Sequence, residues 1–348
     1  MNPYVFIALV FGLAGGTSIT ATSSHWLLAW MGLEMGTLAI IPLMAQHHHP
    51  RAVEATTKYF LTQATAAAML LFASTTNAWF TGQWEISQMT HPLPTMMITM
   101  ALALKIGLAP LHTWLPEVLQ GLSLTTALIL STWQKLAPFI LLLQVNPTNP
   151  TILITMGVAS TIIGGWGGLN QTQLRKLLAY SSIAHLGWMV LVMQFSPSLS
   201  LLTLTIYFTM TFSAFLTFKL NNSTNINSLA ISWAKAPVVT ALTPLVLLSL
   251  AGLPPLTGFM PKWLILQELT KQSLAPVATL VALSALLSLY FYLRLAHAMT
   301  LTTSPNNLTG LAPWRLDPAQ TATPLAISTT GTLTLLPVTP ATSALFAL

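Results

Sequence analysis

The chain has 348 residues, of which 54% are hydrophobic and only 5% are charged. A soluble globular domain carries about 25% charged residues, so this composition excludes water as the main solvent and predicts a polytopic membrane protein. The net charge of +6 comes from scattered cations without the basic stripe of a nucleic-acid-binding surface. The absence of cysteine excludes disulfides, cysteine-ligated iron–sulfur clusters and c-type haem attachment, so any redox chemistry is expected on another chain.

Apolar runs bounded by proline, asparagine, glycine and charge predict an all-α fold of about eleven transmembrane segments. A run of about 20 residues is long enough to cross a hydrocarbon core of about 30 Å. In the first run, Gly12 and Gly16 are spaced four apart, which favours close packing against another helix. The predicted segments are residues 3–22, 25–45, 56–81, 94–118, 123–144, 149–170, 174–195, 199–220, 237–268, 275–297 and 323–347.

Cations distinguish the two sides of this predicted topology. We assign the loops alternately to the two sides of the membrane. Lys271 then falls on the side opposite the N-terminus. Most other cations fall in or beside loops on the side of the N-terminus: Arg51, Lys58, Arg175, Lys176, Lys219, Lys235, Arg294 and Arg315. The positive-inside rule then places the N-terminus in the inner compartment and the C-terminus in the outer one. Three further lysines, at positions 105, 135 and 262, have no loop to occupy.

Two of the predicted segments share an interrupted motif. GLAPLHTWLPEV (107–118) aligns without a gap to GLPPLTGFMPKW (252–263), and each copy lies in the fourth segment of a group of five. Groups of five start on opposite sides of the membrane, which predicts inverted repeats at residues 1–145 and 146–300, followed by a loop and a C-terminal transmembrane helix at 301–348. Proline frees backbone carbonyls that protein or internal water must satisfy, so a break beside a lysine indicates a hydrated cavity. The alternative is a packing kink with a snorkelling lysine.

Four charged residues fall at membrane depth: Glu34, Lys105, Lys135 and Lys262. A charge at the bilayer centre costs about 2.5–3.5 kcal/mol on insertion scales, so such groups usually pair, line water or carry function. Glu34 and Lys105 are expected to titrate as a coupled pair, and a change in their separation would act as a switch. The alternatives are a static ion pair for Glu34 and a snorkelling side chain for Lys135.

Other polar motifs carry weaker indications. His112, beside the first break, and His185, on an otherwise apolar segment, are candidate proton-relay residues. The HHHP tract at 47–50 lacks an evident carboxylate or thiol partner, so no metal site is predicted. No Ser/His/Asp or paired-carboxylate arrangement indicates hydrolysis.

Five motifs carry a resemblance to a known family: SSHWLLAWMGLEM (23–35), EATTKYFLTQATA (54–66), LALKIGLAPLHTWLPEV (102–118), LSTWQKLAP (130–138) and LRKLLAYSSIAHLGWM (174–189). Over essentially its full length the chain resembles the subunit 2 family of mitochondrial NADH:ubiquinone oxidoreductase (respiratory complex I), an antiporter-like family. The resemblance implies a proton-translocating membrane-arm subunit in the mitochondrial inner membrane, with the N-terminus in the matrix and the C-terminus in the intermembrane space.

The resemblance also assigns roles to individual residues. It implies that Glu34 and Lys105 form the switching pair, that Lys135 passes protons along the membrane plane, and that Lys262 completes the route toward the exit side. His112 and His185 join these four as candidate proton-translocation residues. NADH, FMN, iron–sulfur clusters and ubiquinone are expected on other subunits, with no cofactor and no metal on this chain. The expected partners are other membrane-arm subunits and membrane lipid.

Two rival functions remain open from the sequence. A free-standing cation/proton antiporter would share the repeat and the lysines, but would transport ions in isolation. A structural scaffold would use the buried charges only to fix helix register, so neutral substitutions would damage assembly without changing pumping.

Overall fold

The computed structural model describes residues 2–46, 48–145, 150–234, 236–301 and 323–346. Lys235 and Arg315, which enter the charge analysis above, lie outside these residues. Within the described ranges the regular structure is helical, and the β-bridges are isolated. Six helices are long and apolar enough to cross a membrane, which supports a polytopic all-α membrane protein: Pro3–Thr22, Trp26–Met44, Leu124–Gln144, Pro150–Gly168, Pro197–Leu220 and Ala275–Leu301.

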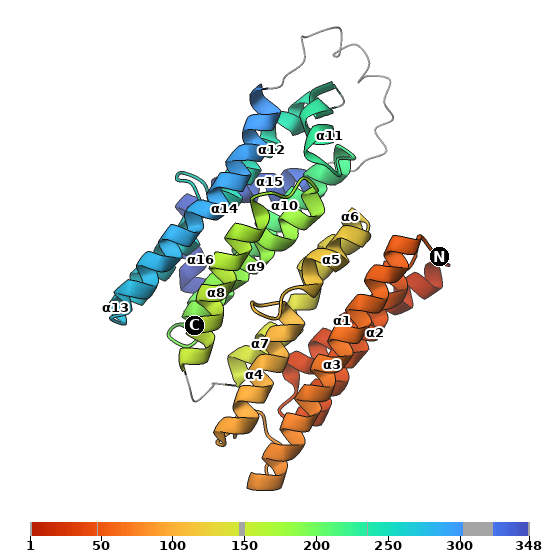
Figure 1. Ribbon diagram of the computed structural model, residues 1–348, viewed down its shortest axis with the longest axis vertical. Coiled ribbons are helices and arrows are strands. Elements are labelled where there is room, and N and C mark those ends of the chain that lie inside the picture. The colour runs from red at the N-terminus through yellow and green to blue at the C-terminus, as the bar shows by residue number, and fades with distance from the viewer. Residues whose placement is uncertain (1, 47, 146–149, 235, 302–322, 347–348) are drawn as a thin grey trace. The chain divides into compact units, whose positions relative to one another are not determined.

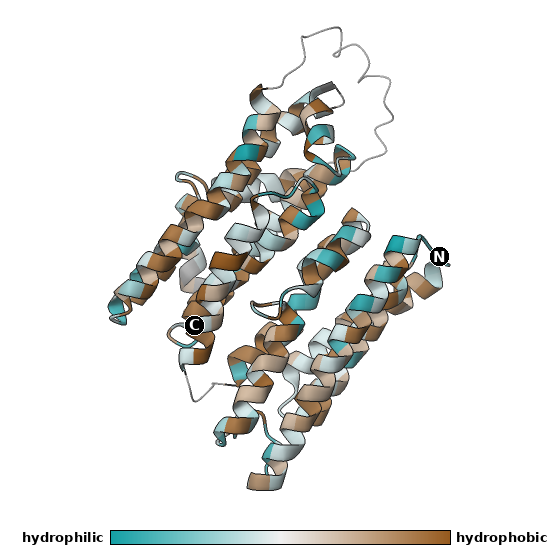
Figure 2. Cartoon of the chain, in the orientation of Figure 1, coloured by the Kyte–Doolittle hydropathy of each residue, from teal (hydrophilic) through white to brown (hydrophobic). Residues whose placement is uncertain are grey.

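The chain divides into two compact units, Met1–Met156 and Gly157–Leu348. Within each unit most helices run along roughly a common direction (Figure 1). Hydrophilic residues gather towards helix ends and connecting segments, whereas the middle of most helices is apolar (Figure 2). This distribution is the one expected of helices whose central turns contact lipid or each other.

In its described residues, the first unit contains seven helices and the start of an eighth: α1 (Pro3–Thr22), α2 (Trp26–Met44), α3 (Pro50–Thr81), α4 (Pro92–Ile106), α5 (Trp114–Gly121), α6 (Leu124–Ser131), α7 (Trp133–Gln144) and α8 (Pro150–Gly168). The α3 helix packs against α2, α4 and α5. It begins with the His49 Nδ1 accepting a hydrogen bond from the Arg51 N–H at 3.2 Å, and it ends at Gly82, whose φ is +71°. At 32 residues it is about 48 Å long, so its ends extend beyond a hydrocarbon core of about 30 Å.

The α1 and α2 helices approach closely through glycine, as the spacing of Gly12 and Gly16 predicts. A Cβ on Gly16 would lie 2.7 Å from the carbonyl oxygen of Gly32, and a Cβ on Gly32 would lie 2.7 Å from the Thr20 Cγ2. Only glycine permits this backbone contact, which supplies van der Waals packing where no hydrophobic effect drives helices together.

The second unit contains the rest of α8 and a longer set of elements: α9 (Leu174–Val192), α10 (Pro197–Leu220), α11 (Ile226–Ala230), a 3-10 turn (Ile231–Ala234), α12 (Pro237–Ala251), α13 (Phe259–Lys271), α14 (Ala275–Leu301), α15 (Thr323–Thr334), a 3-10 turn (Leu336–Val338) and α16 (Thr339–Phe346). The segment expected as a single C-terminal helix at 323–347 is therefore interrupted. Pro337 and Pro340 account for the interruption, because each lacks the N–H that a continuing helix needs.

Several connecting segments of the second unit meet at a common end. The Leu174 N–H donates to the Thr224 carbonyl at 3.0 Å, which joins the connection before α9 to the connection after α10. The Arg294 Nη1 donates to the Leu169 carbonyl at 2.8 Å, so α14 reaches the same end of the unit. Lys271 ends α13, just before the opposite end of α14. Arg294 thus lies at the same end of the second unit as the start of α9, whereas Lys271 lies at the opposite end of α14.

We predict that Gly32→Ala destabilises the protein by about 1–3 kcal/mol, because the new methyl group overpacks the contact between α1 and α2. The measurement is the thermal unfolding of the membrane-extracted protein. Gly36→Ala on the same helix is the matched control, since its Cβ would meet nothing nearer than the Gln134 Oε1 at 3.9 Å. Equal unfolding temperatures for the two variants would contradict the packing argument.

Candidate functional site

The interrupted motif breaks a helix in each unit in the same way. Gly107 and Gly252 follow the ends of α4 and α12 with φ of +86° and +82°, a region that glycine enters without a steric penalty. The N–H groups of Gly107 and Leu108 both donate to the Ala103 carbonyl at 2.9 Å. In the second unit, Gly252 and Leu253 both donate to the Leu248 carbonyl, at 3.1 and 3.3 Å. Bonds of this kind close a helix at a glycine C-cap.

In the first unit, side chains donate to carbonyls at the end of α4. The Trp114 Nε1 donates to the Leu104 carbonyl at 3.0 Å, and the Gln63 Nε2 donates to the Lys105 carbonyl at 3.4 Å. Trp114 is the first residue of α5, whereas Gln63 comes from the middle of α3. The break is therefore held by the helix that follows it and by a neighbouring helix.

A cavity of about 20 Å³ lies in the first unit, next to this break. A water needs about 10–15 Å³ of such volume together with polar partners, so the cavity has room for roughly one water. Lys105 and Lys135 both line it, and its other polar side chains are Thr17, Thr37, Tyr59, Gln63 and Gln134. Two of the four predicted charges thus border a common polar cavity.

Glu34 lies on α2, the helix that contributes Thr37 to the lining of this cavity. Its carboxylate Oε2 accepts a hydrogen bond from the Thr37 Oγ1 at 2.8 Å, and its charge interacts electrostatically with Lys105 and with Tyr59. No direct ion pair between Glu34 and Lys105 occurs among the described residues. The Lys105 Nζ is buried and has no hydrogen-bond partner within the part of the chain that the structure describes. The ammonium is therefore placed near a carboxylate that it does not contact.

Lys135 lies on α7, just after an interruption that the sequence analysis did not predict. Thr132 separates α6 from α7 with φ −114° and ψ −71°, and its Oγ1 donates to the Leu128 carbonyl at 2.8 Å. Pro138 follows within the next turn, as the sequence shows. The Lys135 side chain is only 2% exposed, which argues against a snorkelling side chain.

In the second unit, two consecutive carbonyls at the end of α12 face prolines where a continuing helix would supply N–H donors. Pro254 cannot donate to the Leu250 carbonyl, and Pro255 cannot donate to the Ala251 carbonyl. The Lys262 Nζ donates to the Ala251 carbonyl at 2.6 Å, and the His185 Nε2 lies 3.2 Å from the Leu250 carbonyl. Both carbonyls thus meet titratable side chains.

Lys262 occupies the space directly over the glycine of the break. A Cβ on Gly252 would lie 2.8 Å from the Lys262 Cδ and 2.9 Å from its Nζ. The Nζ also lies 5.9 Å from the centroid of the Trp188 ring, within the range of a cation–π interaction. Lys262 and His185 line a second cavity of about 20 Å³, together with Trp188, Thr203 and Tyr207.

The two candidate histidines differ in their surroundings. His185 is buried on α9, where its Nδ1 lies 2.7 Å from the Ser181 carbonyl. His112 lies half-buried in the segment between α4 and α5, with its Nδ1 3.3 Å from the Pro110 carbonyl. In the HHHP tract, His49 caps α3, and His47 lies outside the described residues.

Sequence reasoning did not single out the five other polar side chains of the first cavity: Thr17, Thr37, Tyr59, Gln63 and Gln134. Tyr59 and Gln63 are both buried on α3 at the i, i+4 spacing that places side chains on one helix face. The sequence signal was a tyrosine and an amide at helical spacing on a helix whose buried residues are mostly small. Gln134 donates from Nε2 to the Gly36 carbonyl at 3.3 Å, so its position depends on a contact distant in sequence.

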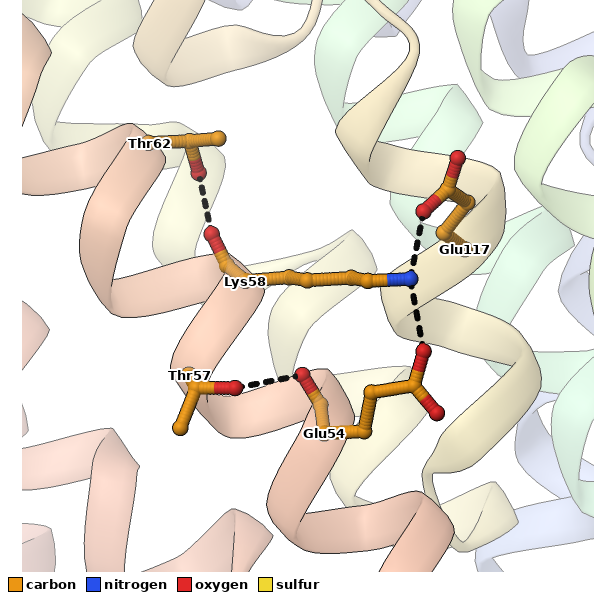
Figure 3. Close-up of polar contacts among 5 residues, drawn as sticks. All are labelled: Glu54, Thr57, Lys58, Thr62 and Glu117. Carbon is orange, nitrogen blue, oxygen red and sulfur yellow. Dashed lines mark hydrogen bonds and ion pairs between the residues drawn. The ribbon is translucent and has the colours of Figure 1, made fainter.

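An exposed ion cluster lies at the start of α3. The Lys58 Nζ is 2.7 Å from a Glu54 oxygen and 2.8 Å from a Glu117 oxygen (Figure 3). Glu117 belongs to α5, so Lys58 joins α3 to the helix that follows the first break. The three side chains are 42–62% exposed, so salt weakens this contact.

Comparisons with known families cover nearly the whole chain. Residues 23–288 match the family described as NADH:quinone oxidoreductase/Mrp antiporter, transmembrane. Residues 289–343 match the family described as NADH dehydrogenase subunit 2 C-terminus. The first match contains both helix breaks and all six candidate residues.

Curated relatives are similar over their full lengths. The chain is 75% identical over 346 residues to NADH-ubiquinone oxidoreductase chain 2 of Tetraodon nigroviridis, covering 99% of each chain. It is 69% identical over 349 residues to the protein of that name from Oncorhynchus mykiss, covering 100% of each.

Solved structures share the fold. A chain of respiratory complex I from Thermus thermophilus has a TM-score of 0.87 at 28% identity, with 99% of this chain and 80% of that chain covered. A chain of the Mrp complex from Dietzia has a TM-score of 0.82 at 16% identity, with coverage of 97% and 76%, and supports the fold alone. The chain therefore belongs to the NADH:quinone oxidoreductase/Mrp antiporter family, and within it to the NADH dehydrogenase subunit 2 proteins.

Proposed function

We propose that this chain is a proton-translocating membrane-arm subunit of NADH:ubiquinone oxidoreductase in the mitochondrial inner membrane. Its family membership and its similarity to vertebrate chain 2 proteins support the assignment to this complex. The observation that carries the mechanism is the small polar cavity that Lys105 and Lys135 both line. Other subunits of the complex are its partners, and NADH oxidation and ubiquinone reduction take place on them.

Glu34 and Lys105 act as the switching pair in this proposal. The Lys105 Nζ is buried without a hydrogen-bond partner among the described residues, while Glu34 acts on it through space. In an effective dielectric of about 20, moving two charges from about 4 Å to about 8 Å apart changes their interaction by about 2 kcal/mol. Moving a charge against 100 mV costs about 2.3 kcal/mol, so a modest displacement of Glu34 relative to Lys105 has the required size.

The cavity then supplies the route from Lys105 to Lys135. A proton can cross it through a single water, since the volume of about 20 Å³ has room for roughly one and the lining offers hydroxyl and amide partners. Lys262 is the proton-carrying group of the second unit. His112 and His185, both near helix breaks, are polar links of the route.

We further propose the inverted-repeat architecture, with five-helix repeats at residues 1–145 and 146–300, a C-terminal helical segment at 301–348 and about eleven spans in total. The matching backbone bonds at Gly107 and Gly252 support a repeat. Arg294 and the start of α9 lie at one end of the second unit, away from Lys271, which is the charge bias expected if that end faces the matrix. An N-terminus in the matrix and a C-terminus in the intermembrane space belong to the same proposal.

Lys105→Met in the assembled complex is expected to lower the ratio of protons pumped to electrons transferred, because methionine fills the space of the lysine stem but cannot carry a proton. The amount of assembled complex is expected to stay near normal, since the Nζ holds no partner among the described residues. The measurement is proton uptake by vesicles during NADH oxidation. Lys219→Met, at an exposed position on α10, is the control.

An unchanged ratio of protons pumped to electrons transferred in Lys105→Met would contradict the proposed proton relay. A scaffold role instead predicts less assembled complex but normal pumping in each complex that forms. A free-standing antiporter predicts cation/proton exchange by the chain purified without other subunits.

Gln63→Leu is expected to destabilise the first break by about 1–3 kcal/mol, because the Lys105 carbonyl loses its side-chain donor inside the protein. The measurement is the thermal stability of the isolated complex. Gln267→Leu, at an exposed position on α13, should change it little. A stable Gln63→Leu complex would mean that water or another donor replaces the amide.

A further inference from the structure

We infer that His185 bridges α9 to the second helix break only while both of its ring nitrogens carry a proton, so that this break responds to proton occupancy at His185. The His185 bridge is defined as the contacts of its Nδ1 with the Ser181 carbonyl and of its Nε2 with the Leu250 carbonyl. The inference rests on the proposed function and assigns His185 a positioning role within it.

The bridge has an acceptor at each end. The Nδ1 lies 2.7 Å from the Ser181 carbonyl oxygen and the Nε2 lies 3.2 Å from the Leu250 carbonyl oxygen. A carbonyl oxygen only accepts hydrogen bonds, and a neutral imidazole carries a single N–H. Both contacts are therefore hydrogen bonds only in the imidazolium, whereas in neutral His185 one carbonyl faces a bare nitrogen.

The contact that neutral His185 loses is the contact with Leu250. Ser181 lies one turn before His185 on the same helix, so the shorter contact is fixed by local geometry. Leu250 belongs to α12 and its carbonyl is approached from another helix at the longer distance. Because Pro254 has no N–H, the helix cannot supply a replacement donor, and a buried carbonyl left without one is unfavourable.

The carbonyl of the next residue, Ala251, contacts a second titratable side chain, Lys262. Lys262 donates to the Ala251 carbonyl at 2.6 Å and lines the same cavity of about 20 Å³ as His185. Loss of a proton from His185 thus releases Leu250 in particular, while Ala251 stays bonded to Lys262. The Leu250 carbonyl thus depends on the proton of His185, whereas the neighbouring Ala251 carbonyl depends on the proton of Lys262.

Few other titratable groups face His185. From α10, the ring of Tyr207 lies 5.5 Å from the imidazole ring, and Tyr292 of α14 interacts electrostatically with Tyr207. From α13 the facing group is Lys262. The described residues of α8, α12 and α15 include no titratable side chain. His185 and Lys262 both line the cavity beside the break.

At the first break, the corresponding carbonyl accepts its bond from a side chain that cannot titrate. In the gapless alignment of the two motifs, Leu250 occupies the place of Lys105, whose carbonyl accepts its bond from the Gln63 amide. Glutamine donates from Nε2 as histidine does, but it neither gains nor loses a proton. His185→Gln would therefore give the second break the kind of donor that the first break has.

The test is His185→Gln in the assembled complex, with Lys262→Met as reference. The expected result is a complex that assembles and oxidises NADH, with a proton-to-electron ratio that falls by at least half of the decrease in Lys262→Met. A wild-type ratio in His185→Gln together with a lowered ratio in Lys262→Met overturns the bridge and leaves the proposed function standing. An unchanged ratio in both variants contradicts the proposed function itself.

A second measurement uses the wild-type complex, so it does not depend on whether a variant folds. Amide hydrogen exchange at Gly252 and Leu253 is compared with exchange at Gly107 and Leu108 across a pH series in the wild-type complex. The comparison cancels the common base catalysis, so the ratio of second to first break should rise with pH by up to about tenfold per unit while His185 loses its proton. A ratio that does not change with pH overturns the inference.

Discussion

The satisfaction of backbone carbonyls inside an apolar medium is the constraint on which the rest of this structure depends. A helix that stops within a membrane leaves carbonyls without donors, and lipid supplies none. Here Trp114, Gln63 and Lys262 donate to such carbonyls, and His185 lies against another. Each of these side chains lies against a carbonyl that a helix break leaves without its usual N–H donor. The polar groups required to stabilise a broken helix are therefore the groups that line the cavities.

This constraint explains why charge and irregular backbone occur together. A lysine in an unbroken apolar helix would have only its own stem to reach a polar environment, whereas a lysine near a break finds carbonyls within reach. Lys262 uses such a carbonyl, and Lys105 borders a cavity beside another break. The two lysines differ in one respect that matters for proton transfer: Lys262 is bonded, while Lys105 has no partner among the described residues. In the proposed relay, the first unit thus holds the lysine without a hydrogen-bond partner among the described residues.

Local sequence patterns predicted the breaks because glycine and proline act on their own backbone. The positions of Gly107 and Gly252, the burial of Lys105 and Lys135, and the close packing at Gly16 all follow from residue type and spacing. A hydrated cavity beside the break was expected, but its polar lining could not be predicted, because Tyr59 and Gln134 reach the cavity through contacts between helices distant in sequence. The interruption at Thr132 and the divided C-terminal segment were also missed, since a single threonine or proline in an apolar run can either bend a helix or end it. Glu34 was expected to couple electrostatically to Lys105, and the separation of the two charges depends on side-chain placement that no sequence pattern encodes.

The close packing of the Lys262 side chain over Gly252 has a consequence for inherited variation. Any side chain at that position meets two obstacles at once: a backbone angle that favours glycine, and a lysine stem already filling the volume where the first carbon would sit. A side chain in place of Gly252 would displace the Lys262 ammonium from the Ala251 carbonyl oxygen. The substitution would therefore move a charge as well as disturb the packing. Variants at this codon should accordingly resemble loss of the lysine in their physiology more than they resemble ordinary folding defects.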